Sequence, residues 1–495
     1  MAVLKWCVFS ALVVWASVGH AENKTVTLTS ESGQLVLQGE ILDFDGRNLS
    51  INSEYGAVVL DSTKLVCTGD ACPNTMQKSE TFRIIAPKSI ADVLLPALIE
   101  NFALRRARDI TQTNDGAVRV MTLRTKADPD RALIFMLDTR DDDTGFDPLA
   151  DAQADMMIGF RALNADEKAK VETQNPAGLG QARSFALALD AMLPVVAPPN
   201  IMKSVPLENV LQSIQETDPN TVLHPKTSAY LVSNGYRILT EQISTDISND
   251  LYADALKLGV VPFSDLGGLQ VLDVTGTCGA MPQMSRRTIK AGDYPLTVPI
   301  YAHLAPFHHG PQVSEFLEYL ASPAAQMVIQ RAGFVDQMLE EIPIAAQGDR
   351  IAYAVATADA GSFEHVQAML KDLQNAYRLT MTFRFDAGGA DLDEQSKSQI
   401  ERLKGLIKSG RFKGRTLYFV GFSDQEGDYT ANLALSQNRA ATVLQSVLAG
   451  LDGTDIDIAA MKSMGYGPVL PMACETTDIG KQINRRVEIW ARASQ

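Results

Sequence analysis

The sequence predicts a multi-domain α/β protein, and three observations carry this prediction. The chain has 495 residues, which is more than a single hydrophobic core usually holds. Residues 22–79 alternate apolar and polar side chains in short runs, a pattern typical of β-strands. Residues 81–340 and 378–495 instead alternate strand-like and helix-like runs. A composition of 46% hydrophobic and 21% charged residues is that of a globular protein.

The N-terminus has the pattern of a secretory signal peptide. Lys5 precedes an apolar run over residues 6–18, and Gly19-His20-Ala21 follows as a cleavage site. We therefore expect residues 1–21 to be removed and the mature chain to reach the periplasm. The apolar run is too short to span a bilayer, and no later segment predicts a transmembrane helix. A net charge of −15 argues against nucleic acid or anionic lipid as a partner.

Residues 22–79 are predicted to form a small β module that contains a disulfide. Cys67 and Cys72 flank a turn-like Thr-Gly-Asp-Ala sequence, and export to an oxidising compartment favours a bridge between them. The alternative is two free thiols. Cys278 and Cys474 are then the remaining pair, but their spacing in the sequence does not establish that they meet.

Residues 80–345 begin with a strand, a turn and a helix. Phe82–Ala86 is a buried-type strand, Ser89 follows in the turn, and residues 90–103 carry apolar side chains at helical spacing. Backbone N–H groups at the start of such a helix can bind an anion. Further stretches then follow at 95–98, 154–161, 259–263, 292–296, 299–301, 316–326 and 332–335.

Together these stretches resemble the phosphate-binding proteins of ABC transporters. The resemblance implies a two-lobed, type II periplasmic-binding-protein fold with phosphate or a related anion as ligand. It implies Ser89 and Arg161 as anion donors; the alternatives are a helix N-cap for Ser89 and an ion pair for Arg161. The glycine-containing phosphate cradle of the family's second lobe is missing from residues 223–230, which predicts weak phosphate binding.

Residues 346–377 are expected to contain a connecting helix, and residues 378–495 a compact α+β sandwich. The apolar spacing places the helix at Phe363–Tyr377. Beyond it, the runs predict strands at 379–385, 415–420 and 485–491, separated by helices at 392–407 and 433–448. The resulting order is β-α-β-α-β.

Asp424 and Arg439 point to a receptor for a zwitterionic amino-acid end. A strand end followed by a helix would bring them to one pocket, where the carboxylate takes an ammonium and the guanidinium takes a carboxylate. The surrounding motifs are Phe385-Asp386, Gly421–Asp424, Asn432, Leu435–Ala440, Gly465–Gly467 and Asn484–Glu488.

This segment resembles the OmpA-like domain that binds the diaminopimelate stem peptide of peptidoglycan. The resemblance implies Phe385, Asp386, Asp424, Asn432 and Arg439 as the binding site, and association with the cell wall or outer membrane. Asn484 and Arg485 are interpreted as structural or rim residues. The alternative is an ordinary Asp424–Arg439 ion pair that orders a loop.

The sequence predicts no enzyme, metal site or cofactor. None of the six histidines has a Cys or His partner at zinc spacing, and no catalytic or nucleotide-binding motif is present. Two hypotheses follow. The chain is a peptidoglycan-tethered, periplasmic solute-binding protein, or it is a structural envelope protein whose receptor-like domain has lost its ligand and serves as an interaction module.

Overall fold

The computed structural model describes most of the chain in two compact units, residues 1–78 and 79–495. The described residues are 25–30, 35–44, 48–62, 65–69, 71–73, 79–126, 128–129, 131–140, 146–173, 182–276, 278, 281–306, 309–358, 360–385, 391–451 and 460–493. The predicted signal peptide therefore lies outside the described residues. No helix within these ranges is both long and apolar enough to cross a bilayer.

The first unit is an antiparallel five-stranded sheet in the order β4-β3-β2-β1-β5. Alternate residues such as Leu28 and Ile51 are buried on one face, as the period-2 pattern requires. Cys67 and Cys72 form the predicted disulfide, so that prediction is confirmed. The strands are β1 (Thr25–Ser30), β2 (Val36–Phe44), β3 (Asn48–Ser53), β4 (Gly56–Asp61) and β5 (Leu65–Thr68).

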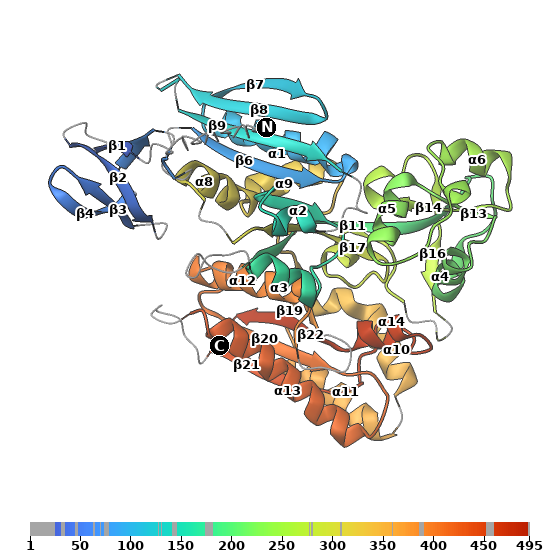
Figure 1. Cartoon of the computed structure of the whole chain (residues 1–495). Helices are drawn as coiled ribbons and strands as arrows, with labels where there is room; N and C mark the ends of the chain where they lie inside the picture. Colours follow the sequence, from blue (N-terminus) through green and yellow to red (C-terminus); the bar gives the residue numbers. More distant parts are fainter. Residues whose placement is uncertain are drawn as a thin grey trace, which may run out of the picture. The chain divides into compact units, whose positions relative to one another are not determined.

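The second unit begins with a two-lobed α/β domain. Its main sheet has the order β13-β14-β11-β17-β10-β6-β9-β8-β7 (Figure 1). The first-lobe elements are β6 (Glu80–Ala86), a π-helical turn (Ile90–Leu94), α1 (Leu95–Arg105), β7 (Arg108–Asp115), β8 (Val118–Thr125), β9 (Ala132–Thr139), α2 (Asp147–Ala150), β10 (Met156–Gly159), α3 (Ala165–Thr173), α8 (Pro311–Leu320) and α9 (Pro323–Arg331). The second-lobe elements are β12 (Ser204–Pro206), α4 (Leu207–Gln215), β13 (Thr221–Leu223), α5 (Pro225–Ser233), α6 (Ile247–Ala253), β14 (Leu258–Pro262), β15 (Gln270–Val271), β16 (Asp273–Thr275) and α7 (Arg286–Lys290).

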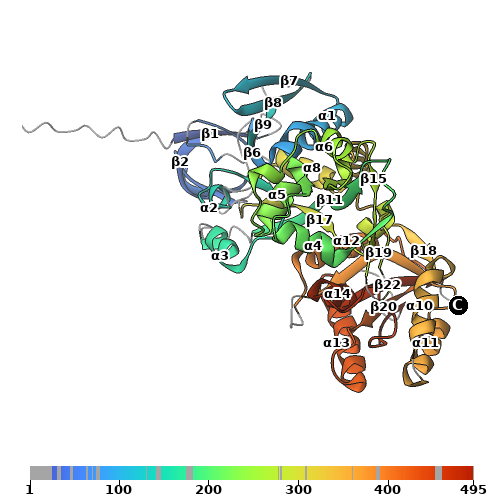
Figure 2. The same ribbon diagram turned by 90° about the vertical axis from the view of Figure 1, so that its right-hand side faces the viewer.

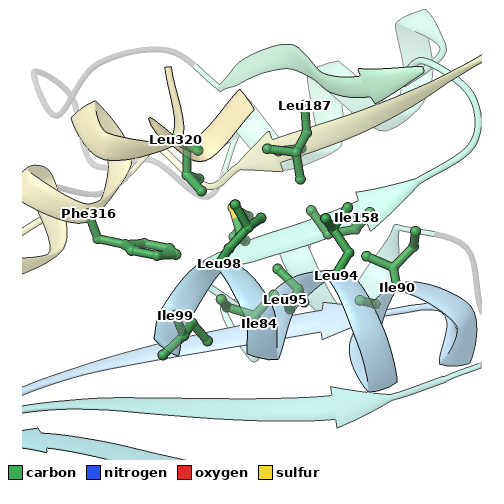
Figure 3. Close-up of a cluster of buried hydrophobic side chains, with 14 of the residues drawn as sticks. Ile84, Ile90, Leu94, Leu95, Leu98, Ile99, Ile158, Leu187, Phe316 and Leu320 are labelled. Atoms are coloured by element: carbon green, nitrogen blue, oxygen red, sulfur yellow. The ribbon is translucent and has the colours of Figure 1, made fainter. Parts of the chain in front are cut away.

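Two long strands cross between the lobes. In Figure 1, β11 (Arg183–Val196) and β17 (Thr297–Leu304) run from the lobe that contains α1 and α9 to the lobe that contains α5 and β14. Leu187 packs in the core of the first lobe and Leu189 in that of the second, and the pairing of β11 with β17 shifts register between Ala186 and Ala188. Figure 3 shows the first core, where the apolar face of α1 meets side chains of the sheet and of α8.

The C-terminal domain is a five-stranded sheet in the order β18-β19-β22-β20-β21 with helices on both faces. Successive residues of β20 point to opposite faces: Phe419 packs with α12 and α13, whereas Tyr418 and Val420 pack with α10 and α11 (Figure 2). Its elements are β18 (Glu341–Pro343), α10 (Gly348–Thr357), α11 (Ala360–Asp372), β19 (Tyr377–Arg384), α12 (Glu394–Lys408), β20 (Arg415–Phe422), α13 (Tyr429–Leu448), β21 (Met461–Gly465), α14 (Asp478–Asn484) and β22 (Arg486–Ala493).

The structure differs from the expected elements in three places. β18 pairs with β19, so residues 341–343 belong to the C-terminal sheet, although we expected them in the two-lobed domain. The expected helix 363–377 is α11, which ends at Asp372, because Asn375 adopts a left-handed conformation (φ 61°) and Tyr377 enters the sheet. β21 and α14 were not predicted, since both are short and carry weak periodicity.

A buried charge network joins the two-lobed domain to the C-terminal domain. Arg378 on β19 donates from Nη1 and Nη2 to the two carboxylate oxygens of Asp293, at 2.6 and 2.7 Å. Its Nε lies 3.2 Å from Glu488, which also accepts from Arg350 and Arg486. Burial alone would lower the pKa of Arg378, but the carboxylates of Asp293 and Glu488 raise it. These two carboxylates therefore stabilise the charged form of Arg378.

Close backbone contacts fix α13 against the sheet. A Cβ atom at Gly421 would lie 2.0 Å from the carbonyl oxygen of Ser436, and one at Gly465 would lie 2.2 Å from the backbone nitrogen of Gln437. Glycine at both positions lets α13 approach β20 and β21 more closely than any side chain would allow.

We expect Gly465→Ala to push α13 off the sheet and to lower the free energy of unfolding by about 1–3 kcal/mol or more. Gly405→Ala is the matched control, because Gly405 is exposed within α12 and its Cβ would meet nothing within 4 Å. That control should raise stability by about 0.5–1 kcal/mol. Urea denaturation of both variants measures the difference, and equal midpoints for Gly465→Ala and the wild type would contradict the packing argument.

Asp293→Asn should destabilise the chain by about 3–5 kcal/mol, because it removes the carboxylate that accepts two hydrogen bonds from the buried guanidinium of Arg378. Glu401→Gln removes an exposed carboxylate that pairs with Lys404, and it should change stability by less than about 1 kcal/mol. Thermal unfolding of the two variants provides the measurement. A similar melting temperature for both would show that the domain interface does not depend on this pair.

Candidate functional site

The topology of the C-terminal sheet gathers the predicted residues at one edge. β19 and β20 both run antiparallel to β22, and β21 runs parallel to β20. The chain therefore leaves β19, β20 and β21 at the same edge at which β22 begins. Phe385 directly follows β19, Asp424 is the second residue after β20, and Arg485 directly precedes β22. The sequence predicted the first two as site residues, and the sheet places them together.

α13 brings the remaining predicted residues to this edge. Asp428 caps the helix by accepting from the backbone N–H of Ala431 at 3.0 Å. Asn432, Ser436 and Arg439 are spaced by four and three residues, so they lie on one face of the helix, and all three are buried. The Ser436 hydroxyl accepts from the backbone N–H of Gly467 at 2.8 Å, which ties this face to the loop after β21.

The guanidinium of Arg439 is buried and incompletely paired. The residue is only 5% exposed, and its side chain lies over the Phe385 ring with Cζ 5.3 Å from the ring centroid. Its Nε and Nη1 atoms have no hydrogen-bond partner among the described residues. Burial lowers the pKa of Arg439, and the nearby positive charge of Arg485 lowers it further. A buried guanidinium with unpaired N–H groups is suited to bind a ligand carboxylate by donating hydrogen bonds to it.

Asp424 pairs with Arg485. The Arg485 Nη1 donates to Asp424 Oδ2 at 3.0 Å, and Asp424 is 7% exposed. An Asp424–Arg439 ion pair, the alternative considered from the sequence, is therefore not the arrangement observed. Arg485 was interpreted as a structural or rim residue, but it contacts the acid at the centre of the site. In the sequence, the only indication of this contact was that Arg485 lies next to Asn484.

The other predicted residues have distinct places. Asn432 Nδ2 donates to the carbonyl of Glu426 at 2.9 Å, so it orders the loop that follows Asp424. Asn484 is fully buried, and its Oδ1 accepts from the backbone N–H groups of Met472 and Ala473. Asp386 lies outside the described residues, so its predicted role in the site stays a prediction.

The predicted anion donors lie in the first lobe. β6 and β10 are parallel neighbours, so Ser89 and Arg161 follow strands that end at the same edge of the sheet. The Ser89 side chain makes no capping hydrogen bond. Arg161 donates to both carboxylate oxygens of Glu167, at 2.7 and 2.6 Å, and its guanidinium lies over Phe146. The observed ion pair is the alternative considered from the sequence, and it leaves less of Arg161 for an external anion.

Direct packing joins the two lobes where a ligand cleft was expected. Tyr230 on α5 of the second lobe belongs to the core of the first lobe, and its ring centroid lies 4.5 Å from that of Phe160. Asn234 Nδ2 donates to the carbonyl of Phe160 at 3.4 Å. The Tyr230 hydroxyl donates to Asp190 at 2.7 Å. A side chain of the protein thus occupies the space between α5 and the end of β10.

Asp190 is a buried polar centre that the sequence did not reveal. Its carboxylate accepts from the hydroxyls of Tyr230 and Ser264 and from the backbone N–H groups of Ser264 and Ala191. Burial raises the pKa of Asp190, although these hydrogen bonds oppose the rise. Lys226 donates to Ser264 at 2.9 Å. These groups form one hydrogen-bonded cluster across α5, β11 and the 3-10 turn Phe263–Asp265 that follows β14.

The described residues contain no group of three or more His, Cys, Asp or Glu side chains that could hold a metal ion. The edge of the C-terminal sheet at which β22 begins carries a guanidinium, a carboxylate and an aromatic ring, which suits a small ligand that carries both an ammonium and a carboxylate.

Comparison with known proteins shows to which family the C-terminal domain is similar. Residues 384–485 match the model of the OmpA family. "Probable lipoprotein YiaD" of Escherichia coli (strain K12) is 30% identical over 105 residues, which is 21% of this chain and 45% of that protein. The chain thus spans less than half the length of this relative.

Two solved structures are similar to separate parts of the chain. An ABC-type phosphate transport receptor from Vibrio cholerae is 13% identical, with a TM-score of 0.38, and the match covers 52% of this chain and 99% of that one. The peptidoglycan-associated lipoprotein from Burkholderia pseudomallei is 24% identical, with a TM-score of 0.20, and the match covers 22% of this chain and 89% of that one.

Proposed function

We propose that this chain is a cell-envelope protein whose C-terminal domain tethers it to diaminopimelate-containing peptidoglycan in the periplasm. The buried, incompletely paired guanidinium of Arg439 carries the proposal. The carboxylate of the diaminopimelate end would accept from Arg439, and its ammonium would lie against Asp424. Phe385 packs against the Arg439 guanidinium, and Asn432 orders the loop that follows Asp424. The family match of residues 384–485 supports this assignment.

Arg485 is part of the proposed binding step. A ligand ammonium and Arg485 compete for the Asp424 carboxylate, or share its two oxygens, since Arg485 contacts only Oδ2. The arriving ligand carboxylate offsets the positive charge that Arg439 and Arg485 together place at this edge of the sheet. Both ends of the zwitterion are therefore needed for tight binding.

Asp424→Ala and Arg439→Ala should each abolish sedimentation of the chain with diaminopimelate-type sacculi. Either change leaves one charged end of the ligand unpaired, a loss of about 2–5 kcal/mol. The control is Lys170→Ala, which removes an exposed charge in the first lobe. If both pocket variants sediment with sacculi as the wild type does, the pocket is assigned to the wrong residues.

For the two-lobed domain, the resemblance to phosphate-binding proteins implies phosphate or a related anion as ligand. Two observations favour the other hypothesis, in which this domain has lost its ligand and serves as an interaction module. Tyr230 fills the space between the lobes against Phe160, and Glu167 neutralises Arg161. A domain whose lobes already pack against each other gains little by closing on a ligand.

We therefore expect phosphate to bind the mature chain with a dissociation constant of about 100 μM or weaker, equivalent to about −5.5 kcal/mol or less favourable. Isothermal titration calorimetry with inorganic phosphate measures this constant. Tyr230→Ala opens the space beside Phe160 and serves as the comparison variant. A sub-micromolar constant for the wild type would restore the receptor hypothesis.

A further inference from the structure

The segment 472–485 lies between the second lobe and the proposed peptidoglycan pocket. Cys474 forms a disulfide with Cys278, which lies 196 residues earlier in the chain. The Thr476 hydroxyl donates to Glu208 on α4 at 2.6 Å. Ile479 packs against the hydrophobic core of the second lobe. This side of the segment is therefore held by the two-lobed domain through a covalent bond, a hydrogen bond and apolar contact.

The other side of the segment organises the pocket. The Glu475 carboxylate accepts from the backbone N–H of Gln425, with its two oxygens at 2.8 and 3.0 Å. Gln425 directly follows Asp424, so Glu475 fixes the backbone that carries the pocket acid. At the end of the segment, Arg485 pairs with Asp424 at 3.0 Å. Asp424 is thus held by the segment from two directions.

Contacts within the segment make it stiff. Asn484 Nδ2 donates to the carbonyl of Ala473 and to Glu475 Oε1, at 2.9 and 2.8 Å. A Cβ atom at Gly480 would lie 1.7 Å from the carbonyl oxygen of Cys474, so α14 packs directly against the backbone of the disulfide-bonded Cys474. We therefore expect a displacement of Cys474 to move Glu475 and Arg485 as well, because these contacts connect the two ends of the segment.

We propose that segment 472–485 couples the peptidoglycan pocket to the second lobe. Glu475 acts as a positioning residue, and the Cys278–Cys474 disulfide is the covalent link to the second lobe. The inference rests on the proposed function and adds its regulation. When the Cys278–Cys474 disulfide is intact, the second lobe holds Asp424 and Arg485 in their binding geometry. When the disulfide is broken, the ligand must order the segment, and the entropy cost of this ordering weakens binding. By linkage, the occupied pocket also stabilises the segment against the second lobe.

The test uses the full mature chain and a soluble muropeptide with a meso-diaminopimelate stem, titrated well below the melting temperature of each variant. Cys278→Ser/Cys474→Ser and Glu475→Ala should each weaken binding about tenfold. Glu475→Gln keeps an acceptor for the Gln425 N–H and should stay within about threefold of the wild type. Cys67→Ser/Cys72→Ser removes the disulfide of the first unit and should leave the affinity unchanged.

A reciprocal measurement separates coupling from general destabilisation. Saturating muropeptide should slow phosphine reduction of Cys278–Cys474 about tenfold, as followed by alkylation and mass spectrometry, and leave Cys67–Cys72 unaffected. If the wild type binds and the Cys278→Ser/Cys474→Ser variant binds equally well, the coupling is overturned while the proposed function stands. If the folded, oxidised wild type does not bind, the proposed function itself fails.

Discussion

The ion pair between Arg378 and Asp293 is the interaction on which the arrangement of the second unit depends. Arg378 is the second residue of β19 in the C-terminal sheet, and Asp293 lies in the turn before β17 of the two-lobed domain. Both are almost completely buried, so each charge requires the other. Glu488 extends the network into the centre of the C-terminal sheet. The two domains therefore share one buried electrostatic core.

The C-terminal domain is also attached to the two-lobed domain through α12 and through a disulfide. α12 contacts β11 of the two-lobed domain, where the Ser398 hydroxyl accepts from the backbone N–H of Ala186 at 3.1 Å. Ala186 lies at the register shift where β11 crosses between the lobes. The C-terminal domain is thus seated on the crossing strands, and the disulfide to Cys278 adds a second attachment. Under the proposed function, a domain held in this way would pass force from the cell wall to the crossing strands and the second lobe.

The filled space between the lobes is consistent with such a mechanical role. Tyr230 joins the lobes through aromatic packing on Phe160 and a hydrogen bond to the buried Asp190. A solute receptor needs lobes that separate and close around a ligand, and this contact opposes separation. The pocket of the C-terminal domain is different, because Arg439 keeps unpaired donors in a buried position. At this end of the C-terminal sheet, a ligand carboxylate could satisfy the unpaired Nε and Nη1 donors of Arg439.

The sequence by itself determined the order of domains, most strands and helices, the Cys67–Cys72 disulfide and the residue types of the pocket. The strands and helices follow from the local periodicity of apolar residues, and the Cys67–Cys72 disulfide follows from a short loop. The pocket residues follow from motifs that lie near the ends of neighbouring strands. Tertiary structure alone decided that Arg485 pairs with Asp424, that Cys278 meets Cys474, that β18 joins the C-terminal sheet and that Tyr230 fills the space between the lobes. Each of these joins residues far apart in the chain or in different domains. The physical reason is that such contacts depend on the packing of whole domains, which no local pattern encodes.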